Sequence, residues 1–393
     1  MSDSRNRGFS TRAVHGVPDP VEVPPDAVVE PIHQSVSFAF DSAEQFADVI
    51  NGRRTGYSYG RLENPTQEAL ARVVADLEGA EAGLALASGM AALHAALLAE
   101  LRAGDHVVAA RALYGSTFAL LARVLPRYGM RVDFADCTDL SAVERAIRPE
   151  TRVVLCETIA NPTLQLCDLE QVSALCHAAG ARLVVDNTFA SPYLCNPLAL
   201  GADVVMHSAT KYLGGHGDVI AGVLVGKKER IDAARALTID VGGIASPLGA
   251  WLCLRGIRTL SLRMERHCQS ALRIAEHLEK DPRVERVSYP GLESFPQRDL
   301  ARRQLRLGGG MVAFELRGGL EAGRRFMDRL RLVRRAGSLG AVHSLVLHPA
   351  STSHRQLSRD ERQAAGIPDG FVRLSVGLED VEDLLSDISD SLD

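Results

Sequence analysis

Lysine is scarce in this chain of 393 residues. Only four of its 44 basic side chains are lysines, which leaves 40 arginines. Lys227, Lys228 and Lys280 lie at the ends of predicted helices, where a solvated charge is ordinary. Lys211 lies instead in "SATKYLGG", directly after the apolar segment "ADVVMHS". Such a lysine either extends from a strand end to solvent or is used chemically, because partial burial makes its amine a base and a nucleophile.

The chain also lacks long apolar runs and long runs of one charge. No segment is apolar over enough residues to cross a bilayer, and the start, "MSDSRNRGFSTRAVHG", contains no signal-peptide core. The formal net charge is −5, without a basic patch, which argues against nucleic acids and membrane surfaces as partners. We therefore expect a cytoplasmic protein.

Two further absences concern bound groups. No lysine is followed by serine or threonine, and no GxGxxG motif follows a strand, which argues against the common nucleotide sites. The cysteines form no CxxC pair, which fits reduced, buried thiols better than disulfides or zinc. We expect no metal ion and a core position for Cys137, Cys156, Cys167, Cys176, Cys195, Cys253 and Cys268.

The sequence divides into three parts. Residues 1–62 are rich in proline, glycine and turn formers and predict an N-terminal arm. Residues 63–248 alternate short apolar strands with helices, which predicts an α/β domain whose mostly parallel sheet is covered on both faces. Ser246 and Pro247 predict the start of a long amphipathic helical stretch. Residues 249–393 mix strands and helices in another order, as in a smaller α+β domain.

Ligands of such sheets gather at the carboxyl ends of the strands, where helix N-termini also point. "LALASGMAAL" places Ser88, Gly89 and Met90 in a strand-to-helix turn that could hold a phosphate, although small residues are common in such turns. Asp186 ends the strand of "RLVVDNTF" and, taken alone, fits a helix cap or a metal ligand equally well. Together with Lys211 these residues predict a site for pyridoxal 5′-phosphate (PLP), whose aldehyde bonds to a lysine and whose pyridine nitrogen needs an acid.

Other side chains suit the same site. Ser208 and Thr210 flank the lysine and supply hydroxyl groups for the phosphate. Tyr114 follows the strand of "DHVVAA" and offers a ring to stack on the pyridine and a phenol to donate a proton, unless it only packs against the sheet. Arg373 lies in the apolar strand of "FVRLSVGLED", a costly position that suits a guanidinium binding a substrate carboxylate.

These motifs resemble those of the PLP-dependent enzymes of cysteine and methionine metabolism, the cystathionine γ-synthase, cystathionine γ-lyase and methionine γ-lyase group. The similarity runs over nearly the whole chain and is most specific in "VVDNTFASPYL" and "HSATKYLGGHGD". It extends to "YGRLENPT", "EAGLALASGM", "ETIANPT", "LRGIRTLSLRMERH" and "SLGAVHSLVLHPASTSH". It implies an aspartate-aminotransferase-like α/β fold (fold type I) and a homotetramer built as a dimer of dimers.

By the same resemblance Lys211 carries PLP as a Schiff base, Asp186 pairs with its pyridine nitrogen and Tyr114 stacks on its ring. Tyr59 and Arg61 of the arm would reach the cofactor phosphate of a neighbouring subunit. The other implied cofactor contacts are Ser88, Gly89, Met90, Glu157, Asn161, Thr188, Ser208 and Thr210. The implied substrate contacts are Tyr114, Asn161, Ser338 and Arg373.

The segments "GLALASGM", "YGSTFALL" and "AGRRFMDRL" are most similar to methionine γ-lyases. This implies α,γ-elimination of L-methionine, or a related thioether, to 2-oxobutanoate, ammonia and a thiol. Ser116 stands where those enzymes usually carry cysteine, and the loop "TIDVGGIASP" lacks their lysine before "SP". Gly337 stands where enzymes acting on cystathionine commonly have glutamate. Cystathionine γ-lyase, cystathionine γ-synthase and O-acylhomoserine sulfhydrylase activities stay open as alternatives.

In the implied reaction Lys211 takes the Cα proton of the substrate and carries protons to other carbons, while Tyr114 protonates the departing thiol. A binding protein without chemistry is one rival, since a fold does not fix a function. The presence of Lys211, Asp186, Tyr114 and Arg373 together argues against it. A nucleotide-binding α/β protein is the other rival, and it predicts a phosphate loop that the sequence lacks.

Overall fold

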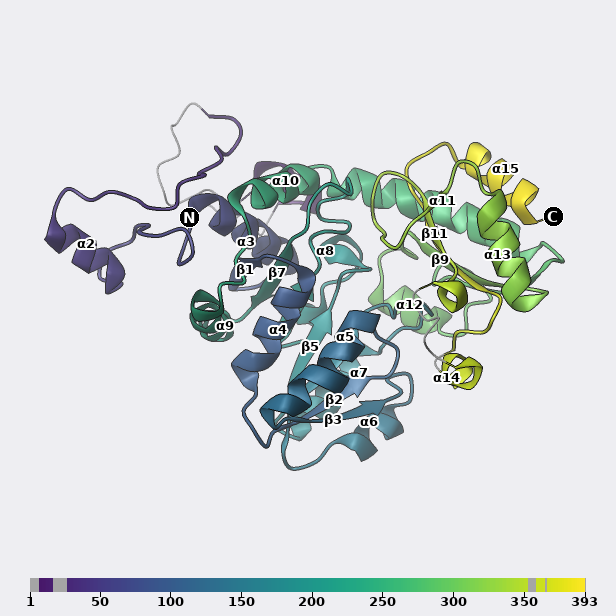
Figure 1. The fold of residues 1–393 in the computed structure, drawn as a ribbon, viewed down its shortest axis with the longest axis horizontal. Coiled ribbons are helices and arrows are strands. Elements are labelled where there is room, and N and C mark those ends of the chain that lie inside the picture. The colour runs from purple at the N-terminus through teal and green to yellow at the C-terminus, as the bar shows by residue number, and fades with distance from the viewer. Residues whose placement is uncertain (1–6, 17–26, 353–357, 365, 393) are drawn as a thin grey trace.

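Two β-sheets with their own helices lie next to each other along the long axis of the molecule (Figure 1). The structure is a computed structural model that describes residues 7–16, 27–352, 358–364 and 366–392. The larger sheet is built from residues 82–226 and the smaller one from residues 284–375. The two sheets fall on either side of the predicted boundary at residues 248 and 249, while the boundaries themselves stay predictions.

The larger sheet has seven strands in the order β1, β7, β6, β5, β4, β2, β3. All pairs are parallel except those of β7, which runs antiparallel to both β1 and β6. This agrees with the predicted mostly parallel sheet. β7 reverses because a loop, 208–221, joins it to β6 in place of a crossover helix, and this loop carries Lys211. The strands are β1 (Ala82–Leu86), β2 (His106–Ala110), β3 (Arg131–Ala135), β4 (Thr151–Glu157), β5 (Arg182–Asp186), β6 (Val204–His207) and β7 (Gly222–Gly226).

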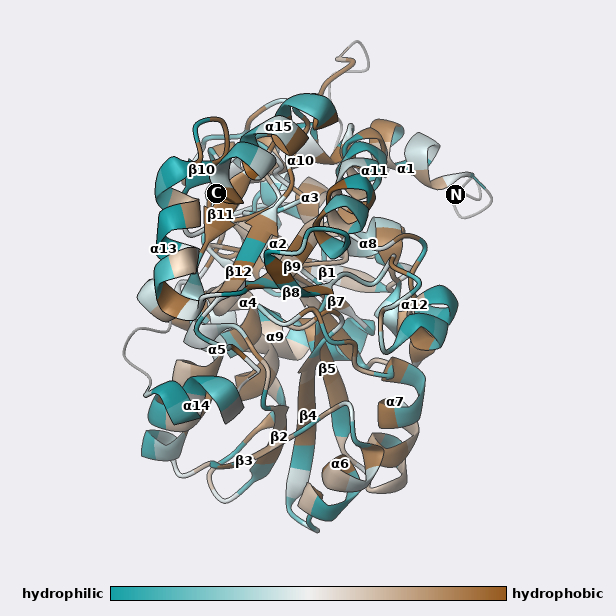
Figure 2. Cartoon of the chain, turned by 90° about the vertical axis from the view of Figure 1, so that its right-hand side faces the viewer, coloured by the Kyte–Doolittle hydropathy of each residue, from teal (hydrophilic) through white to brown (hydrophobic). Residues whose placement is uncertain are grey.

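Helices cover both faces of this sheet, so strands such as β2 and β7 are buried along their whole length, and apart from His106 at the start of β2 their residues are apolar or glycine. In Figure 2 the helices α4 and α5 lie on one side of the strands and α7 and α8 on the other. The brown, apolar colouring is concentrated on the strands between them. The helices are α3 (Pro65–Glu78), α4 (Gly89–Glu100), α5 (Gly115–Ala119), α6 (Leu140–Ala146), α7 (Leu169–Ala178), α8 (Ser191–Leu194) and α9 (Lys228–Val241).

The smaller sheet has five strands in the order β10, β11, β12, β9, β8. It is mostly antiparallel, with one parallel pair between β10 and β11. Its strands are β8 (Val284–Ser288), β9 (Met311–Leu316), β10 (Arg334–Arg335), β11 (Leu345–Leu347) and β12 (Phe371–Ser375). The accompanying helices are α10 (Pro247–Ile257), α11 (Leu260–Glu279), α12 (Arg298–Gln304), α13 (Gly319–Arg329), α14 (Arg359–Ala364) and α15 (Val381–Leu392).

Helix boundaries follow the local sequence in some places and depart from it in others. The predicted start of α10 is confirmed, since the Ser246 hydroxyl accepts a hydrogen bond from Gly249 N and Pro247 is the first helical residue. The long stretch that follows is broken, because α10 ends at Ile257 and α11 begins at Leu260. The segment 115–129, which reads as one helix, is α5 followed by a π-helical turn and a 3₁₀ turn that contains Pro126.

The N-terminal arm has two structural parts. α1 (Phe9–His15) docks on the body, where Arg12 pairs with Asp76. α2 (Ala43–Ile50) lies far from the body in Figure 1, and none of its residues is buried in the single chain. In the described part of the chain, no helix is both long and apolar enough to cross a membrane.

Candidate active site

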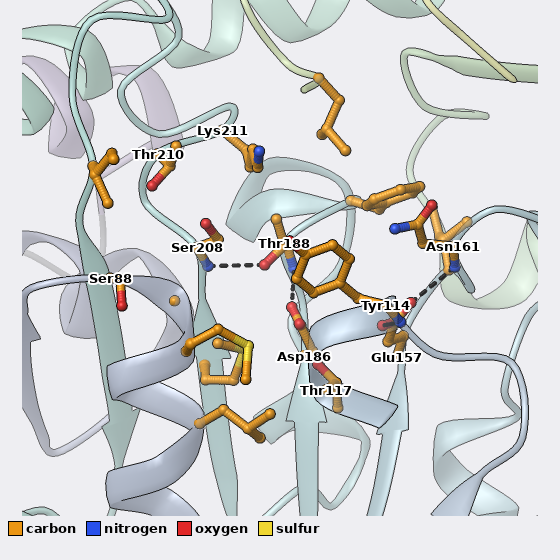
Figure 3. Close-up of a pocket in the computed structure, with 18 of the residues that line it drawn as sticks. Ser88, Tyr114, Thr117, Glu157, Asn161, Asp186, Thr188, Ser208, Thr210 and Lys211 are labelled. Carbon is orange, nitrogen blue, oxygen red and sulfur yellow. Dashed lines mark hydrogen bonds between the residues drawn. The ribbon is translucent and has the colours of Figure 1, made fainter. Parts of the chain in front are cut away.

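A cavity of about 230 Å³ opens at the carboxyl ends of β4, β5 and β6, where α4 also begins. This is the edge of the sheet at which the sequence placed the site. Figure 3 shows the lining side chains converging on one space from the strand ends, the start of α4 and the loop after β6. The lining residues are Ser88, Gly89, Met90, Leu93, Tyr114, Thr117, Glu157, Ile159, Asn161, Asp186, Thr188, Phe189, Met206, Ser208, Thr210, Lys211, Ile220, Gly337, Leu339 and Arg373.

One end of the cavity is built as an anion site. Ser88 caps α4 by accepting a hydrogen bond from Ala91 N, so the first N–H groups of this 12-residue helix face the cavity. A Cβ on Gly89 would lie 2.7 Å from the Ser208 Cβ, so the helix approaches the β6 loop closely only because this residue is glycine. Ser208 N donates to the Thr188 hydroxyl at 2.8 Å, which fixes the loop beside the helix.

Asp186 lies at the end of β5, in the floor of the cavity. Its Oδ1 accepts a hydrogen bond from Thr188 N at 2.9 Å. Burial raises the pKa of Asp186, while the bonds from Thr188 and the nearby His207 lower it. A partly buried carboxyl whose pKa is subject to these opposing effects is suited to a cationic partner in the cavity.

Glu157 holds two separate loops of the site together. Its two carboxyl oxygens accept hydrogen bonds from Tyr114 N at 2.7 Å and from Asn161 N at 2.8 Å, the second of which is visible as a dashed line in Figure 3. Burial and then the neighbouring Asp186 raise the pKa of Glu157 well above its ordinary value. Tyr114 is about half exposed and its ring lies at the mouth of the cavity. Glu157 therefore sets the positions of Tyr114 and Asn161.

Lys211 lies in the turn after β6 rather than in a strand, and its amine points into the cavity (Figure 3). Nζ donates to the Ser338 hydroxyl at 2.9 Å. Burial, and then the Arg373 guanidinium, lower the pKa of Lys211, because both disfavour the ammonium form. The unusual lysine of the sequence is thus a partly buried amine with no carboxylate bound to it among the described residues.

Arg373 lies on β12 and brings the smaller sheet to the cavity. It is 5% exposed, and Nη1 and Nη2 donate to Asn161 Oδ1 at 2.8 Å and to Ser338 O at 3.0 Å. Burial lowers the pKa of Arg373 to about 10. Its Nε is buried and has no hydrogen-bond partner among the described residues. A guanidinium in the lining of a cavity is suited to bind a carboxylate.

The structure brings most of the predicted site residues together but not all of them. Tyr59 and Arg61 do not line the cavity; Arg61 lies over the Tyr59 ring and donates to Ile239 O. Ser338 contacts Lys211 without lining the cavity. Ser116 does not line the cavity either, whereas the next residue, Thr117, does. The lining residues that sequence reasoning missed are Leu93, Thr117, Ile159, Phe189, Met206, Ile220 and Leu339. Helical spacing from Met90 is a signal for Leu93, whereas Ile220 and Leu339 lie in loops and have no such signal.

Comparison with known proteins agrees with this geometry. The profile described as "Cys/Met metabolism PLP-dependent enzyme" matches residues 10–393. The chain belongs to this family. The L-methionine gamma-lyase of Pseudomonas putida is 48% identical over 98% of this chain and 97% of its own, and that of Porphyromonas gingivalis is 47% identical over 100% and 98%. The crystal structure of metB from Corynebacterium glutamicum has a TM-score of 0.92 at 40% identity, covering 98% of both chains.

Membership of the Cys/Met metabolism PLP-dependent enzymes confirms the expected fold type I, the enzyme class and the PLP cofactor. The described residues fit that cofactor. The helix N-terminus with Ser88 and Ser208 suits a phosphate, the acid at Asp186 suits a pyridinium, and the amine of Lys211 suits an aldehyde. Among the described residues, no group of three histidine, cysteine, aspartate or glutamate side chains is placed to hold a metal ion.

Proposed function

We propose that this PLP-dependent enzyme is a lyase that catalyses α,γ-elimination of L-methionine, or a related thioether, to 2-oxobutanoate, ammonia and a thiol. The observation that carries the proposal is the apolar part of the cavity lining, to which Ile159, Ile220 and Leu339 contribute, while Gly337 offers no side chain. The acids among the described lining residues are Asp186 and Glu157, and both oxygens of Glu157 already accept backbone hydrogen bonds, from Tyr114 N and Asn161 N, so neither is left for a second amino group. The names of the two bacterial lyases that are 47–48% identical support the same substrate.

The roles proposed for the site residues follow from their bonds. PLP, when bound, supplies an aldehyde for the substrate amine and a ring that accepts electrons from the Cα–H bond. The Lys211 amine donates to the Ser338 hydroxyl, which leaves its lone pair free to take the Cα proton and return protons to the carbon chain. Asp186 holds the pyridine nitrogen, and Arg373, whose guanidinium belongs to the cavity lining, binds the substrate carboxylate. The phenol of Tyr114, at the cavity mouth, donates a proton to the departing sulfur.

The test is product analysis with the purified, PLP-loaded enzyme. L-Methionine, L-cystathionine, L-homocysteine and O-succinyl-L-homoserine with sulfide are offered in parallel, and 2-oxo acid and thiol release are measured. The proposal expects the highest kcat/KM with L-methionine. Turnover of cystathionine alone, or product only from the succinyl ester with sulfide, would replace it with one of the alternative activities.

We also propose that the enzyme is a homotetramer, a dimer of dimers, in which Tyr59 and Arg61 of one copy reach the cofactor phosphate of another. The phosphate end of the cavity supports this, because its described lining contains hydroxyl and N–H groups but no arginine. The arm carries exposed apolar side chains that need a partner surface. These are Val28, Val29, Ile32, Val36, Phe46 and Ile50.

We further propose that the protein is cytoplasmic. All seven cysteines are buried, and none forms a disulfide. Free thiols throughout a chain fit a reducing compartment.

A further inference from the structure

At the ends of the strands that border the cavity, some side chains point to the opposite side of the sheet. Side chains alternate along a strand, so the residue after each cavity residue points to the other side of the sheet. Asp186 and Met206 are register partners on β5 and β6 and both line the cavity. Asn187 and His207, which follow them, are not in the cavity lining and point to the side covered by α3.

A buried carboxylate joins the residues on that opposite side of the sheet. Glu78, the last residue of α3, accepts hydrogen bonds from His207 Nε2 and Asn187 Nδ2, each at 2.7 Å on Oε1. Oε2 accepts from Asn196 Nδ2 at 3.2 Å. Thr158, which directly follows the last residue of β4, donates to Asn187 Oδ1 at 2.8 Å. The network therefore links the ends of β4, β5 and β6 to α3.

The charges of Glu78 and His207 can be inferred from their hydrogen bonds and their burial. Three N–H donors converge on the Glu78 carboxyl, a set of partners that suits a carboxylate acceptor. The Glu78 side chain is 0% exposed and that of His207 is 1% exposed. A buried carboxylate is costly without a cation, and the only basic side chain bonded to it in the described structure is His207.

The other titratable groups around Glu78 and His207 do not supply a cation for the Glu78 carboxyl. From the segment after α8 the network meets the Cys195 thiol, whose pKa is raised by burial and then by Glu78. On the cavity side of the sheet the nearest acids are Asp186 and Glu157, which face each other on adjacent strands. On the next strand, β7, the partner of His207 is the apolar Val223. After burial, which raises the pKa of Asp186, and the hydrogen bonds from Thr188, which lower it, the nearby His207 lowers it further.

We propose that Glu78 and His207 form a buried ion pair behind the cofactor site that keeps Asp186 ionised and in place for the pyridine nitrogen. They are positioning residues, since neither lines the cavity. The inference rests on the role proposed above for Asp186. It predicts that removing either charge weakens the bond to the ring nitrogen and spares the contacts to the phosphate and the aldehyde.

The test compares two ligands of the apoenzyme. Dissociation constants are measured from pH 5.5 to 9 for PLP and for an analogue whose ring nitrogen is replaced by C–H. The wild type, Glu78→Gln and His207→Gln are compared. Each variant is expected to lose about tenfold in affinity for PLP and little for the analogue, since one pKa unit corresponds to a factor of ten. The acid limb of PLP binding is expected to move to higher pH, because Asp186 without the cation takes up a proton more readily.

Control variants separate this effect from general damage. Glu78→Asp keeps the charge and should largely keep the preference for PLP over the analogue. His106→Gln removes another fully buried histidine of the same sheet, at the opposite end of the strands, and should leave the preference unchanged. Equal losses for PLP and for the analogue in Glu78→Gln and His207→Gln would overturn the inference.

Two further measurements keep the outcome unambiguous. Asp186→Asn should abolish the preference for PLP; if it does not, the role proposed for Asp186 fails first. If the Glu78 and His207 variants do not fold, nitrogen NMR of the wild-type apoenzyme with labelled histidine decides. One imidazole should carry both protons at a pH where the exposed histidines have lost theirs. Finding no such imidazole would overturn the ion pair.

Discussion

At the scale of single residues, the proposed chemistry depends on basic groups whose charged forms are disfavoured by burial or by a neighbouring like charge. Lys211 is a partly buried amine beside the guanidinium of Arg373, and both effects lower its pKa. A lysine adjusted in this way has a larger fraction of free amine at neutral pH, which general-base catalysis needs. The cost of burying Arg373 is offset by hydrogen bonds to Asn161 and Ser338.

Replacing Arg373 tests both of its effects. In Arg373→Met the pKa of Lys211 should rise, because a like charge has been removed, so reaction of the apoenzyme with PLP should need a higher pH. KM for the amino acid should rise roughly 10- to 100-fold, as expected for a lost charge-assisted bond. The measurements are visible absorbance of cofactor recombination against pH and steady-state kinetics. Arg266→Met, at a surface pair with Asp380, is the control, and equal effects in both variants would contradict the role.

The sequence alone was enough to find the residues whose type is unusual for their surroundings. Lys211 stands out because lysine is rare here, and Arg373 because its neighbours are apolar. The link between Glu78, Asn187 and His207 could not be predicted, because it joins three segments far apart in the chain and needs the register of β5 and β6. A buried histidine in an apolar strand has no sequence signal that separates packing from function.

At the scale of elements, the site depends on where helices begin. Ser88 caps α4, which therefore starts at the cavity, and Ser246 caps the start of α10 in the same way. The alternation of short apolar segments with amphipathic ones predicted the strands of the larger sheet and the helices that cover it. The antiparallel β7 was not predicted, because strand direction depends on what the loop 208–221 contains rather than on the strand's own residues.

The cap of α10 should contribute measurably to stability. Ser246→Ala removes the bond to Gly249 N and should lower the free energy of unfolding by about 1 kcal/mol, measured by urea denaturation. Ser42→Ala is the matched control. Ser42 caps α2 in the same way, but α2 buries no residue in the single chain, so this substitution should cost the global transition less. A larger effect at Ser42 would show that this account of α10 is wrong.

α11 contributes a pH dependence through His267. Burial lowers the pKa of His267 to about 4, from about 6.5 for an unperturbed imidazole. Between these values the unfolded chain binds the proton and the folded chain does not, so stability falls as the pH drops from 6.5 to 4. This one group accounts for about 3 kcal/mol of that loss.

The check is urea denaturation of His267→Gln and wild type across this pH range. The variant is expected to be less stable at pH 7 but to lose less stability on acidification. Cys268→Ala, a buried neighbour whose thiol pKa is raised to about 12, should keep the wild-type slope. A wild-type slope in His267→Gln would contradict the assignment.

At the scale of the whole molecule, the proposed assembly would complete the phosphate site of one copy with Tyr59 and Arg61 from the arm of another. Two inactive variants should therefore restore each other. In hybrid dimers of Arg61→Ala and Lys211→Ala, one of the two sites has an intact Lys211 and receives an intact Arg61 from the other copy. With random pairing an equal mixture should recover about a quarter of wild-type activity, since half of the dimers are hybrids with one complete site. Activity no higher than that of the separate variants would show that each chain builds its own site.

The most direct test of the central claim is the stoichiometry of products from L-methionine. Purified, PLP-loaded enzyme is incubated with L-methionine, and methanethiol, ammonia and 2-oxobutanoate are quantified together. The account predicts the three products in equal amounts, and none above background from Lys211→Ala loaded with PLP in the same way. Formation of the 2-oxo acid without methanethiol, or equal turnover by Lys211→Ala, would contradict γ-elimination at this lysine.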